Sequence, residues 1–141
     1  MPDCLTPVPA DIIAHNLAVV DAHIQGEARD PAGVMALYTD DIVLESPLRE
    51  LRLTDKAAIE ANYLAMFAAM RDVEIQPVDR FATETRVVDD CIVRFTLSGE
   101  GFYRAPAPVG SKVELRLVHV FQMRDGRIAR ETVHEAWKIL A

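Results

Sequence analysis

The sequence predicts one α+β domain, with helices in its first half and an antiparallel sheet made mainly by its second half. Apolar residues recur at helical spacing in the first half and alternate with polar residues from position 73 onward. Helices grouped before a run of strands indicate an α+β fold rather than a parallel α/β sheet. The 141 residues, 50% of them apolar, suffice for one hydrophobic core. Residues 1–8 are expected to form a flexible tail and 9–141 the domain.

The first helix is predicted from about Pro9 to Arg29. Its apolar stripe consists of Ala10, Ile13, Leu17, Val20 and Ile24. Asp30 and Pro31 then begin a short second helix, because aspartate caps helix starts and proline suits the first helical position. This second helix is expected to end near residues 39–41.

The remaining elements are two short strands, a third helix and about four long antiparallel strands. They are expected at 42–46, 51–53, 54–70, 73–87, 91–97 and 113–137, the last segment being a hairpin of two strands. Thr54 caps the third helix, and Asp89-Asp90 is predicted to turn the chain between two of the strands. A curved antiparallel sheet with three helices across one face encloses a pocket, which is a natural small-molecule site.

The hairpin carries the main candidate for a chemical site. Its outgoing strand places an apolar row on one face, made of Val113, Leu115, Leu117, Phe121 and Met123. His119 lies in the middle of this row. A titratable group on an apolar face is where a protein can tune a pKa, although a histidine packed in the core with its hydrogen bonds satisfied would look the same in sequence.

The turn at Asp125-Gly126 decides which residue faces His119. A two-residue turn would place Thr132 opposite, whereas a three-residue loop with a left-handed glycine would place Glu131 opposite. We favour the second form, because it also brings Val133 and Trp137 onto the apolar face. A Glu131–His119 pair would hold the imidazole in one tautomer and raise its basicity, as a general base requires. The alternative is a Glu131 that faces solvent.

Composition excludes several functions. The formal charge of −7 disfavours a nucleic-acid partner, and no apolar run approaches the roughly 20 residues that span a bilayer. The protein is therefore expected to be cytoplasmic. His23 and Glu27 have the spacing of a metal-ligand pair, but without a third ligand we expect them to be an exposed helical pair, so no metal site is predicted. Nucleophile and phosphate-loop motifs are also absent from the sequence.

Two segments, ALYTDDIVLESP and HVFQMRDGRIARE, together with the order of elements, resemble the nuclear transport factor 2-like superfamily. Within it the sequence is most similar to SnoaL-like polyketide cyclases and ketosteroid isomerases, over about Ile12 to Trp137. The resemblance implies a cone-shaped, cystatin-like α+β barrel with a pocket for a hydrophobic small molecule. It also implies a homodimer packed through the outer sheet face, and neither a metal nor an organic cofactor.

The resemblance also shows where this sequence departs from the isomerase pattern. Ser46, before Pro47, stands where the isomerases have their aspartate base, and a serine cannot act as a carboxylate. His119 stands where they have an oxyanion-stabilising acid and where the cyclases have an acid/base aspartate. Tyr38 and Tyr63 match two tyrosines of the isomerase network. The donor tyrosine of the first helix has no counterpart.

The sequence thus leads to two hypotheses. In the first, His119 and Glu131 are catalytic and move a proton alpha to a carbonyl, as in an isomerase or cyclase. The substrate-binding residues would then be Tyr38, Ser46, Tyr63 and Phe67. In the second hypothesis, the protein is a non-catalytic ligand-binding or dimerisation domain of the same fold.

Overall fold

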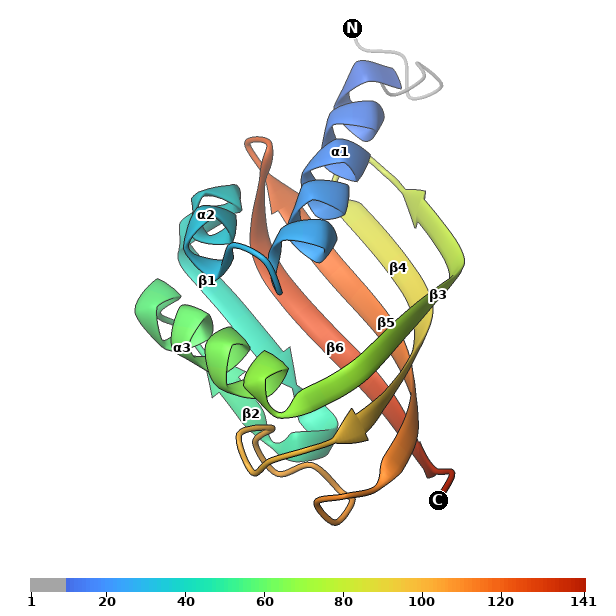
Figure 1. Ribbon diagram of the computed structural model, residues 1–141. Helices are drawn as coiled ribbons and strands as arrows, with labels where there is room; N and C mark the ends of the chain where they lie inside the picture. The colour runs from blue at the N-terminus through green and yellow to red at the C-terminus, as the bar shows by residue number, and fades with distance from the viewer. Residues whose placement is uncertain (1–9) are drawn as a thin grey trace, which may run out of the picture.

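The computed structural model describes residues 10–141 and confirms the α+β architecture (Figure 1). The expected tail at 1–8 lies outside the described residues. The helices are α1 (Ala10–Gly26), α2 (Pro31–Val34) and α3 (Lys56–Ala68), with 3-10 turns at Met35–Leu37 and Pro47–Arg49. The strands are β1 (Tyr38–Ser46), β2 (Leu51–Leu53), β3 (Met70–Ala82), β4 (Arg86–Leu97), β5 (Lys112–Arg124) and β6 (Arg127–Ile139). No helix among the described residues combines the length and apolar character needed to cross a membrane.

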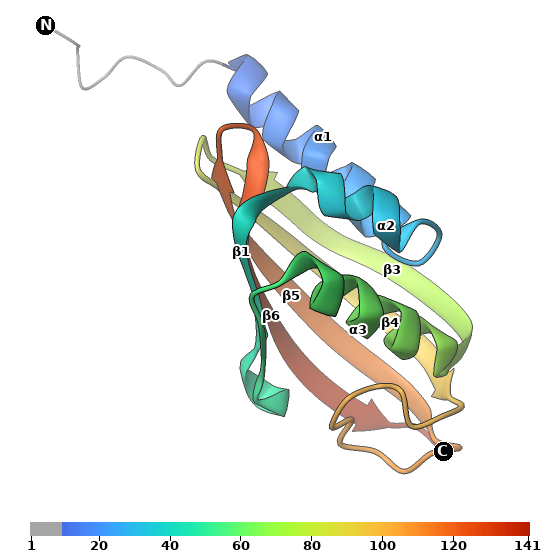
Figure 2. The same cartoon turned by 90° about the vertical axis from the view of Figure 1, so that its left-hand side faces the viewer.

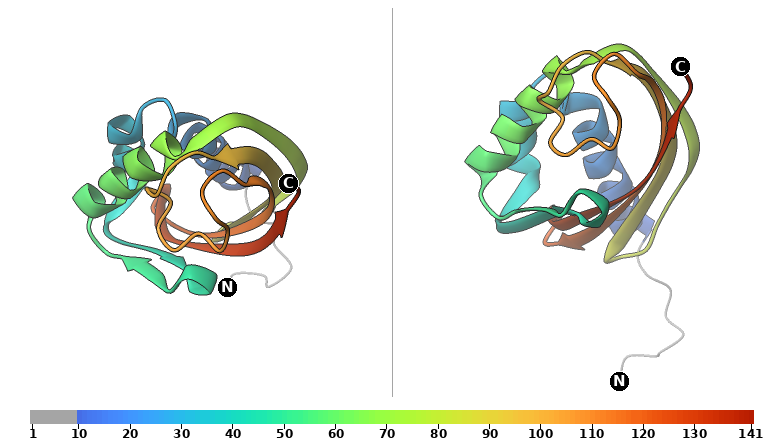
Figure 3. Two further views of the ribbon diagram at one scale, coloured as in Figure 1. Left: turned by 60° about the horizontal axis from the view of Figure 1, so that its bottom comes forward. Right: turned by 90° about the horizontal axis from the view of Figure 1, so that it is seen from below.

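The six strands form one curved sheet in the order β2-β1-β6-β5-β4-β3, which is not closed into a barrel. All neighbouring strands are antiparallel except β1 and β6, which run parallel. The three helices lie on the concave side of this sheet (Figure 2). The loop between β4 and β5 lies across the lower end of the cone (Figure 3). Helices, sheet and loop therefore surround the inner face from three sides.

Helices α2 and α3 both begin at an aspartate cap, and the cap of α3 lies one residue later than predicted. Asp30 caps α2 as expected, its carboxylate accepting the backbone N–H of Gly33 at 3.1 Å. Helix α3 is capped by Asp55 rather than by Thr54, because the Asp55 carboxylate accepts the N–H of Ala57 at 3.0 Å. Tyr38, expected near the end of the second helical segment, is instead the first residue of β1.

The predicted turn at Asp89-Asp90 is wrong, because both residues lie inside β4. The chain turns earlier, at residues 83–85, where the Thr83 hydroxyl accepts the N–H groups of Thr85 and Arg86. Consecutive aspartates are typical of turns. Here arginines on adjacent strands offset the two charges: Arg80 binds Asp89 at 2.7 Å, and Arg116 binds Asp90 at 2.6 Å.

Both expected partners of His119 are also wrong, because Val133 lies opposite it. Asp125 and Gly126 form a two-residue turn, both with positive φ (52° and 76°). One extra residue in β6, Ala129, then shifts the register so that Glu131 pairs with Phe121. The turn is therefore the two-residue form. Because Ala129 adds one residue to β6, Glu131 nevertheless points inward, as the three-residue alternative predicted.

Candidate functional site

A cavity of about 90 Å³ lies between α3, the concave face of the sheet and the loop after β4. Its walls are largely apolar. They include Leu44, Met66, Phe67, Val93, Phe102, Leu115, Leu117 and Val133. The polar side chains on this lining form two groups, one around Glu131 and His119 and the other around Glu135. A small apolar cavity with a few converging polar groups is the usual form of a small-molecule site.

The first polar group is a chain of buried hydrogen bonds. The hydroxyl of Tyr38 lies 2.7 Å from Nε2 of His23 and 2.9 Å from the hydroxyl of Tyr63. Tyr63 in turn donates to the carboxylate of Glu131 at 3.2 Å. Burial raises the pKa of both tyrosines well above 10, and the nearby Glu131 charge raises them further, so both remain protonated donors.

Glu27 extends this chain at its other end. One of its carboxyl oxygens lies 3.6 Å from Nδ1 of His23, and its side chain, 18% exposed, lines the cavity. Burial and the charge of Glu131 raise the pKa of Glu27 to about 8, so this carboxyl is mostly protonated at neutral pH. Burial lowers the pKa of His23, which keeps its imidazole neutral. Two carboxyl groups on the cavity lining are thus joined through three buried side chains.

His119 belongs to a second chain that crosses β5, β4 and β3. Its Nδ1 lies 3.6 Å from the carboxylate of Asp89, which accepts a hydrogen bond from Arg80 at 2.7 Å. Burial by itself lowers the pKa of His119, but the pairing with Asp89 and the charge of Glu131 raise it above its ordinary value. The ring stacks on Phe121, with centroids 5.8 Å apart. The Asp89–Arg80 pair therefore fixes the electrostatic environment of His119.

The second polar group is centred on Glu135, which is 1% exposed. Its carboxylate accepts hydrogen bonds from Ser46 at 2.6 Å, from Arg49 at 3.0 Å and from the indole of Trp137 at 2.8 Å. The Arg49 guanidinium also lies over the ring of Phe102, 4.8 Å from its centroid. These contacts satisfy the Glu135 carboxylate and tie the loop after β4 to the sheet.

The structure brings most of the predicted residues to one cavity. Its lining includes His119, Glu131, Ser46, Tyr63 and Phe67. Tyr38 is fully buried and reaches the cavity only through Tyr63. The Ser46 hydroxyl is occupied by Glu135.

Sequence reasoning missed several residues. The prediction that His23 and Glu27 form an exposed pair is wrong, because His23 is fully buried. A signal was present: Asn16, Val20, His23 and Glu27 follow one face of α1 at helical spacing. Asp89 was missed because it was assigned to a turn, although it alternates inward with Val87 and Cys91.

Among residues 10–141, two groups of three side chains have the composition of a metal site. They are His23–Glu27–Glu131 and Asp89–Cys91–His119, each with its ligand atoms within 4.8 Å of one another. In the first group, the tyrosines already engage His23 and Glu131. Among the described residues, Nδ1 of His23 in the first group and Nδ1 of His119 in the second are buried without a hydrogen-bond partner.

The fold and its cavity define the class of protein: a member of the nuclear transport factor 2-like superfamily, with helices and a curved sheet around an internal pocket. Within that class the chain belongs to the SnoaL-like domain family, whose model matches residues 18–131. A search of curated protein sequences finds no match.

Several solved structures share the fold. A SnoaL-like polyketide cyclase candidate from Jannaschia sp. CCS1 has a TM-score of 0.75 and 17% identity, covering 96% of this chain and 91% of that chain. A phenazine biosynthesis-related protein from Pseudomonas aeruginosa has a TM-score of 0.75 and 14% identity, covering 96% and 83%. An LEH-like epoxide hydrolase from M. tuberculosis has a TM-score of 0.66 and 17% identity, covering 88% and 84%. At identities this low, the structural likeness establishes a common fold alone.

Proposed function

We propose that this protein is an acid–base enzyme that binds a hydrophobic small molecule and moves a proton alpha to a carbonyl group. The observation that carries the proposal is the apolar cavity that has His119, Tyr63 and Glu131 together on its lining. An acid–base reaction needs a proton acceptor, a donor for the oxygen that gains charge, and exclusion of water. This cavity offers all three.

His119 is the proposed proton acceptor. Its Nδ1 is turned toward Asp89, which leaves Nε2 for the bound molecule. The proton leaves the carbon next to the carbonyl for Nε2, and the electron pair of the C–H bond moves toward the carbonyl oxygen as an enolate forms. The negative charges of Asp89 and Glu131 stabilise the imidazolium. The same imidazolium returns the proton to a different carbon in an isomerisation, or to the oxygen formed when the enolate closes a ring.

Donors for the developing enolate oxygen come from the other side of the cavity. Tyr63 is one candidate, since its hydroxyl proton, directed at Glu131 without substrate, would turn to the enolate oxygen. Protonated Glu27 is another, because its side chain also lines the cavity. Phe67 and the other apolar walls would hold the hydrocarbon part of the substrate. Ser46, already bonded to Glu135, would orient a second polar group of the substrate through its oxygen.

The name of one structural neighbour, a polyketide cyclase candidate, supports a reaction of this general kind. The experiment that tests the proposal needs no knowledge of the natural substrate. Cyclic diketones and aromatic ketones are incubated with the protein in D₂O, and exchange of the proton alpha to the carbonyl is followed by NMR. The variants are His119→Gln and, as matched control, the exposed histidine variant His134→Gln.

Wild type should accelerate exchange for at least one ketone, and His119→Gln should lose about 10²-fold or more of that rate, the usual contribution of a positioned base. His134→Gln should keep the wild-type rate. Equal rates for wild type and His119→Gln would refute the role of His119.

The second candidate function is ligand binding without catalysis. It is favoured by Ser46, which stands where related isomerases have a carboxylate base and whose hydroxyl is taken up by Glu135. Mass spectrometry of co-purifying molecules separates the two functions. A molecule that is retained unchanged by wild type and by His119→Ala, with no exchange in D₂O, would identify a binding protein.

A further inference from the structure

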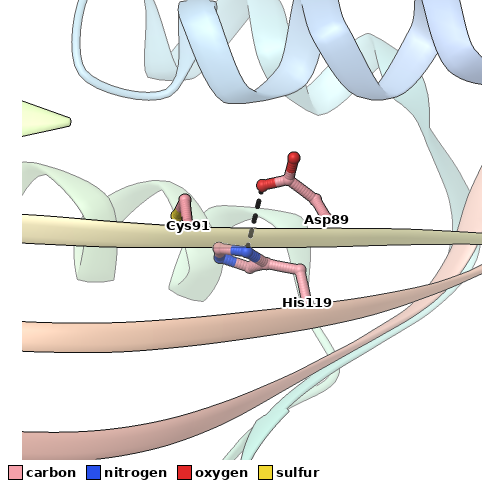
Figure 4. Close-up of side chains that lie close together, drawn as sticks. All are labelled: Asp89, Cys91 and His119. Atoms are coloured by element: carbon pink, nitrogen blue, oxygen red, sulfur yellow. Dashed lines mark ion pairs between the residues drawn. The ribbon is translucent and has the colours of Figure 1, made fainter. Parts of the chain in front are cut away.

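We propose that Asp89, Cys91 and His119 form a binding site for a divalent metal ion of the zinc type. The three side chains come from neighbouring strands, with Asp89 directly opposite His119 and Cys91 two residues further along β4. All three point to the inner side of the sheet, under α1 (Figure 4). They are 4%, 6% and 6% exposed, and their ligand atoms lie within 4.8 Å of one another.

The geometry around His119 is the first observation in favour of a metal. Its Nδ1 is buried and has no hydrogen-bond partner in the described part of the chain. The nearest carboxylate oxygen, from Asp89, is 3.6 Å away, which is too long for a hydrogen bond. Two ligands held at about 2.0–2.1 Å by one tetrahedral ion lie roughly 3.3–3.4 Å apart. A shift of a few tenths of an ångström would therefore place both atoms on one metal.

The kinds of ligand are the second observation. A thiolate, an imidazole and a carboxylate together suit zinc, whereas calcium and magnesium prefer oxygen ligands alone. The charges of a doubly positive ion, a thiolate and a carboxylate also sum to zero, which a buried site requires. Three protein ligands leave the fourth position open.

The neighbours of the three residues would support such a site. Asp89 is oriented by Arg80, and Arg80 is itself bonded to Asp21 at 2.9 Å. Partners of this kind hold metal ligands in place and make up part of a site's affinity. In the other possible metal group, Nδ1 of His23 is likewise unpartnered, but Nε2 of His23 and the Glu131 carboxylate are already hydrogen-bonded to Tyr38 and Tyr63. That group also lacks a thiolate, so the ion is placed at Cys91.

The metal site shares His119 with the proposed function, although the observations and the test that carry it are separate. A metal on Nδ1 places the remaining imidazole proton on Nε2, which then donates a hydrogen bond instead of accepting a proton. The loaded and metal-free forms would therefore present different groups at the same place in the cavity.

The test uses Co²⁺ as an absorbing probe for the zinc-type ion. The full chain is stripped with a chelator and titrated with Co²⁺ while absorption is recorded. We expect a thiolate-to-cobalt charge-transfer band together with intense d–d bands of four-coordinate cobalt, and we expect Zn²⁺ to displace both. Activity is not needed for this measurement, so its outcome is separate from that of the ketone exchange experiment.

Matched variants locate the ion. Cys91→Ser should abolish the charge-transfer band, and His119→Gln should weaken Co²⁺ binding by more than about 100-fold, beyond the usual loss on removing an outer partner. Asp90→Asn, Cys4→Ser and Glu27→Gln should bind Co²⁺ like wild type, since Asp90 is bonded to Arg116 instead. Circular dichroism checks that each variant is folded, and Cys91→Ala replaces Cys91→Ser if that variant is not.

Three results would overturn the proposal. Wild type binds no Co²⁺ at concentrations below a millimolar; the band persists in a folded Cys91 variant; or the band disappears in Cys4→Ser, which would place the ion at the other cysteine. Any of them leaves Cys91 as a small buried apolar side chain.

Discussion

At the scale of single residues, the protein places ionisable groups where burial changes their protonation. Glu131 ends a chain of buried hydrogen bonds that begins at His23, and Glu27 lies beside His23 at the other end. Burial together with the Glu131 charge raises the pKa of Glu27 to about 8. His23 donates toward Tyr38, Tyr38 toward Tyr63, and Tyr63 toward the Glu131 carboxylate. Nδ1 of His23 lies 3.6 Å from Glu27 and has no hydrogen-bond partner among the described residues.

The raised pKa of Glu27 predicts a pH-dependent stability that Glu27→Gln removes. The folded state holds a proton that the unfolded state releases at its ordinary pKa of 4.5, so stability falls between about pH 4.5 and 8. The slope is about 1.4 kcal/mol per pH unit at most. Urea unfolding should show Glu27→Gln to be more stable than wild type at pH 9 and equal to it at pH 4.

A surface variant controls for the general effect of charge. Glu100→Gln, in the exposed loop after β4, should follow wild type at every pH. If Glu27→Gln also loses stability in parallel with wild type between pH 4.5 and 8, the pKa of Glu27 is not raised.

The candidate site could be predicted from the sequence only where a residue follows a single periodicity. His119 was identified because it interrupts a row of alternating apolar residues in one long strand. His23 and Asp89 were not identified, because their burial depends on neighbours in space. A pair of polar residues on a helix is buried or exposed according to what packs on it. An Asp-Asp pair lies in a turn or in a strand according to the arginines beside it. Those arginines, Arg80 and Arg116, lie on the strands next to β4.

At the scale of elements, the hairpin of β5 and β6 sets which residues enter the cavity. Asp125 and Gly126 turn the chain with positive φ, and the extra residue Ala129 then restores the inward face of Glu131. A bulge of this kind leaves no clear mark in sequence, since alanine fits either side of a sheet. The two-residue alternative therefore predicted the turn correctly, and the three-residue alternative predicted the inward face of Glu131.

The turn makes Gly126→Ala a specific prediction about this element. An alanine at φ +76° is strained by roughly 1–2 kcal/mol, and its Cβ would also lie 2.8 Å from Nε2 of His15, displacing the hydrogen bond from His15 to the Gly126 carbonyl. Urea unfolding should show a loss of stability larger than that of Gly110→Ala, where φ is +98° and no atom lies within 4 Å of the added Cβ.

The contribution of His15 can be separated from that of the backbone. In a His15→Ala background, Gly126→Ala should cost about as much as Gly110→Ala. A Gly126→Ala protein as stable as wild type would show that the turn does not need the left-handed conformation.

At the scale of the whole molecule, we propose that two copies associate through the convex face of the sheet. The helices cover only the concave side (Figure 1). The convex side presents the half-buried residues Val88, Ile92, Val118 and Val120 between ion pairs such as Arg94–Glu114.

The cytoplasmic location and the lack of a nucleic-acid partner remain predictions from composition.

The proposed association predicts a dimer of 15.7 kDa chains that Val118→Asp dissociates, because a carboxylate at the centre of an apolar contact would be buried without a partner. Sedimentation equilibrium measures both masses. Leu64→Asp, on α3 and 58% exposed, is the matched control and should remain dimeric. Association through another face would leave Val118→Asp dimeric, and a monomeric wild type at micromolar concentration would contradict the proposal altogether.

The parallel pairing of β1 with β6 has a consequence for how the chain reaches its folded state. It joins residues far apart in sequence: contacts such as Glu45–Arg130 and Ser46–Glu135 span 85 and 89 positions. Contacts of high sequence separation slow folding, because a large loop must close before they form. On the ribosome, β1 would have to wait until β6 is synthesised, and both carboxylates that β6 supplies to the cavity would arrive together with it. A chain that stops before β6 would lack the lining of its site as well as the centre of its sheet.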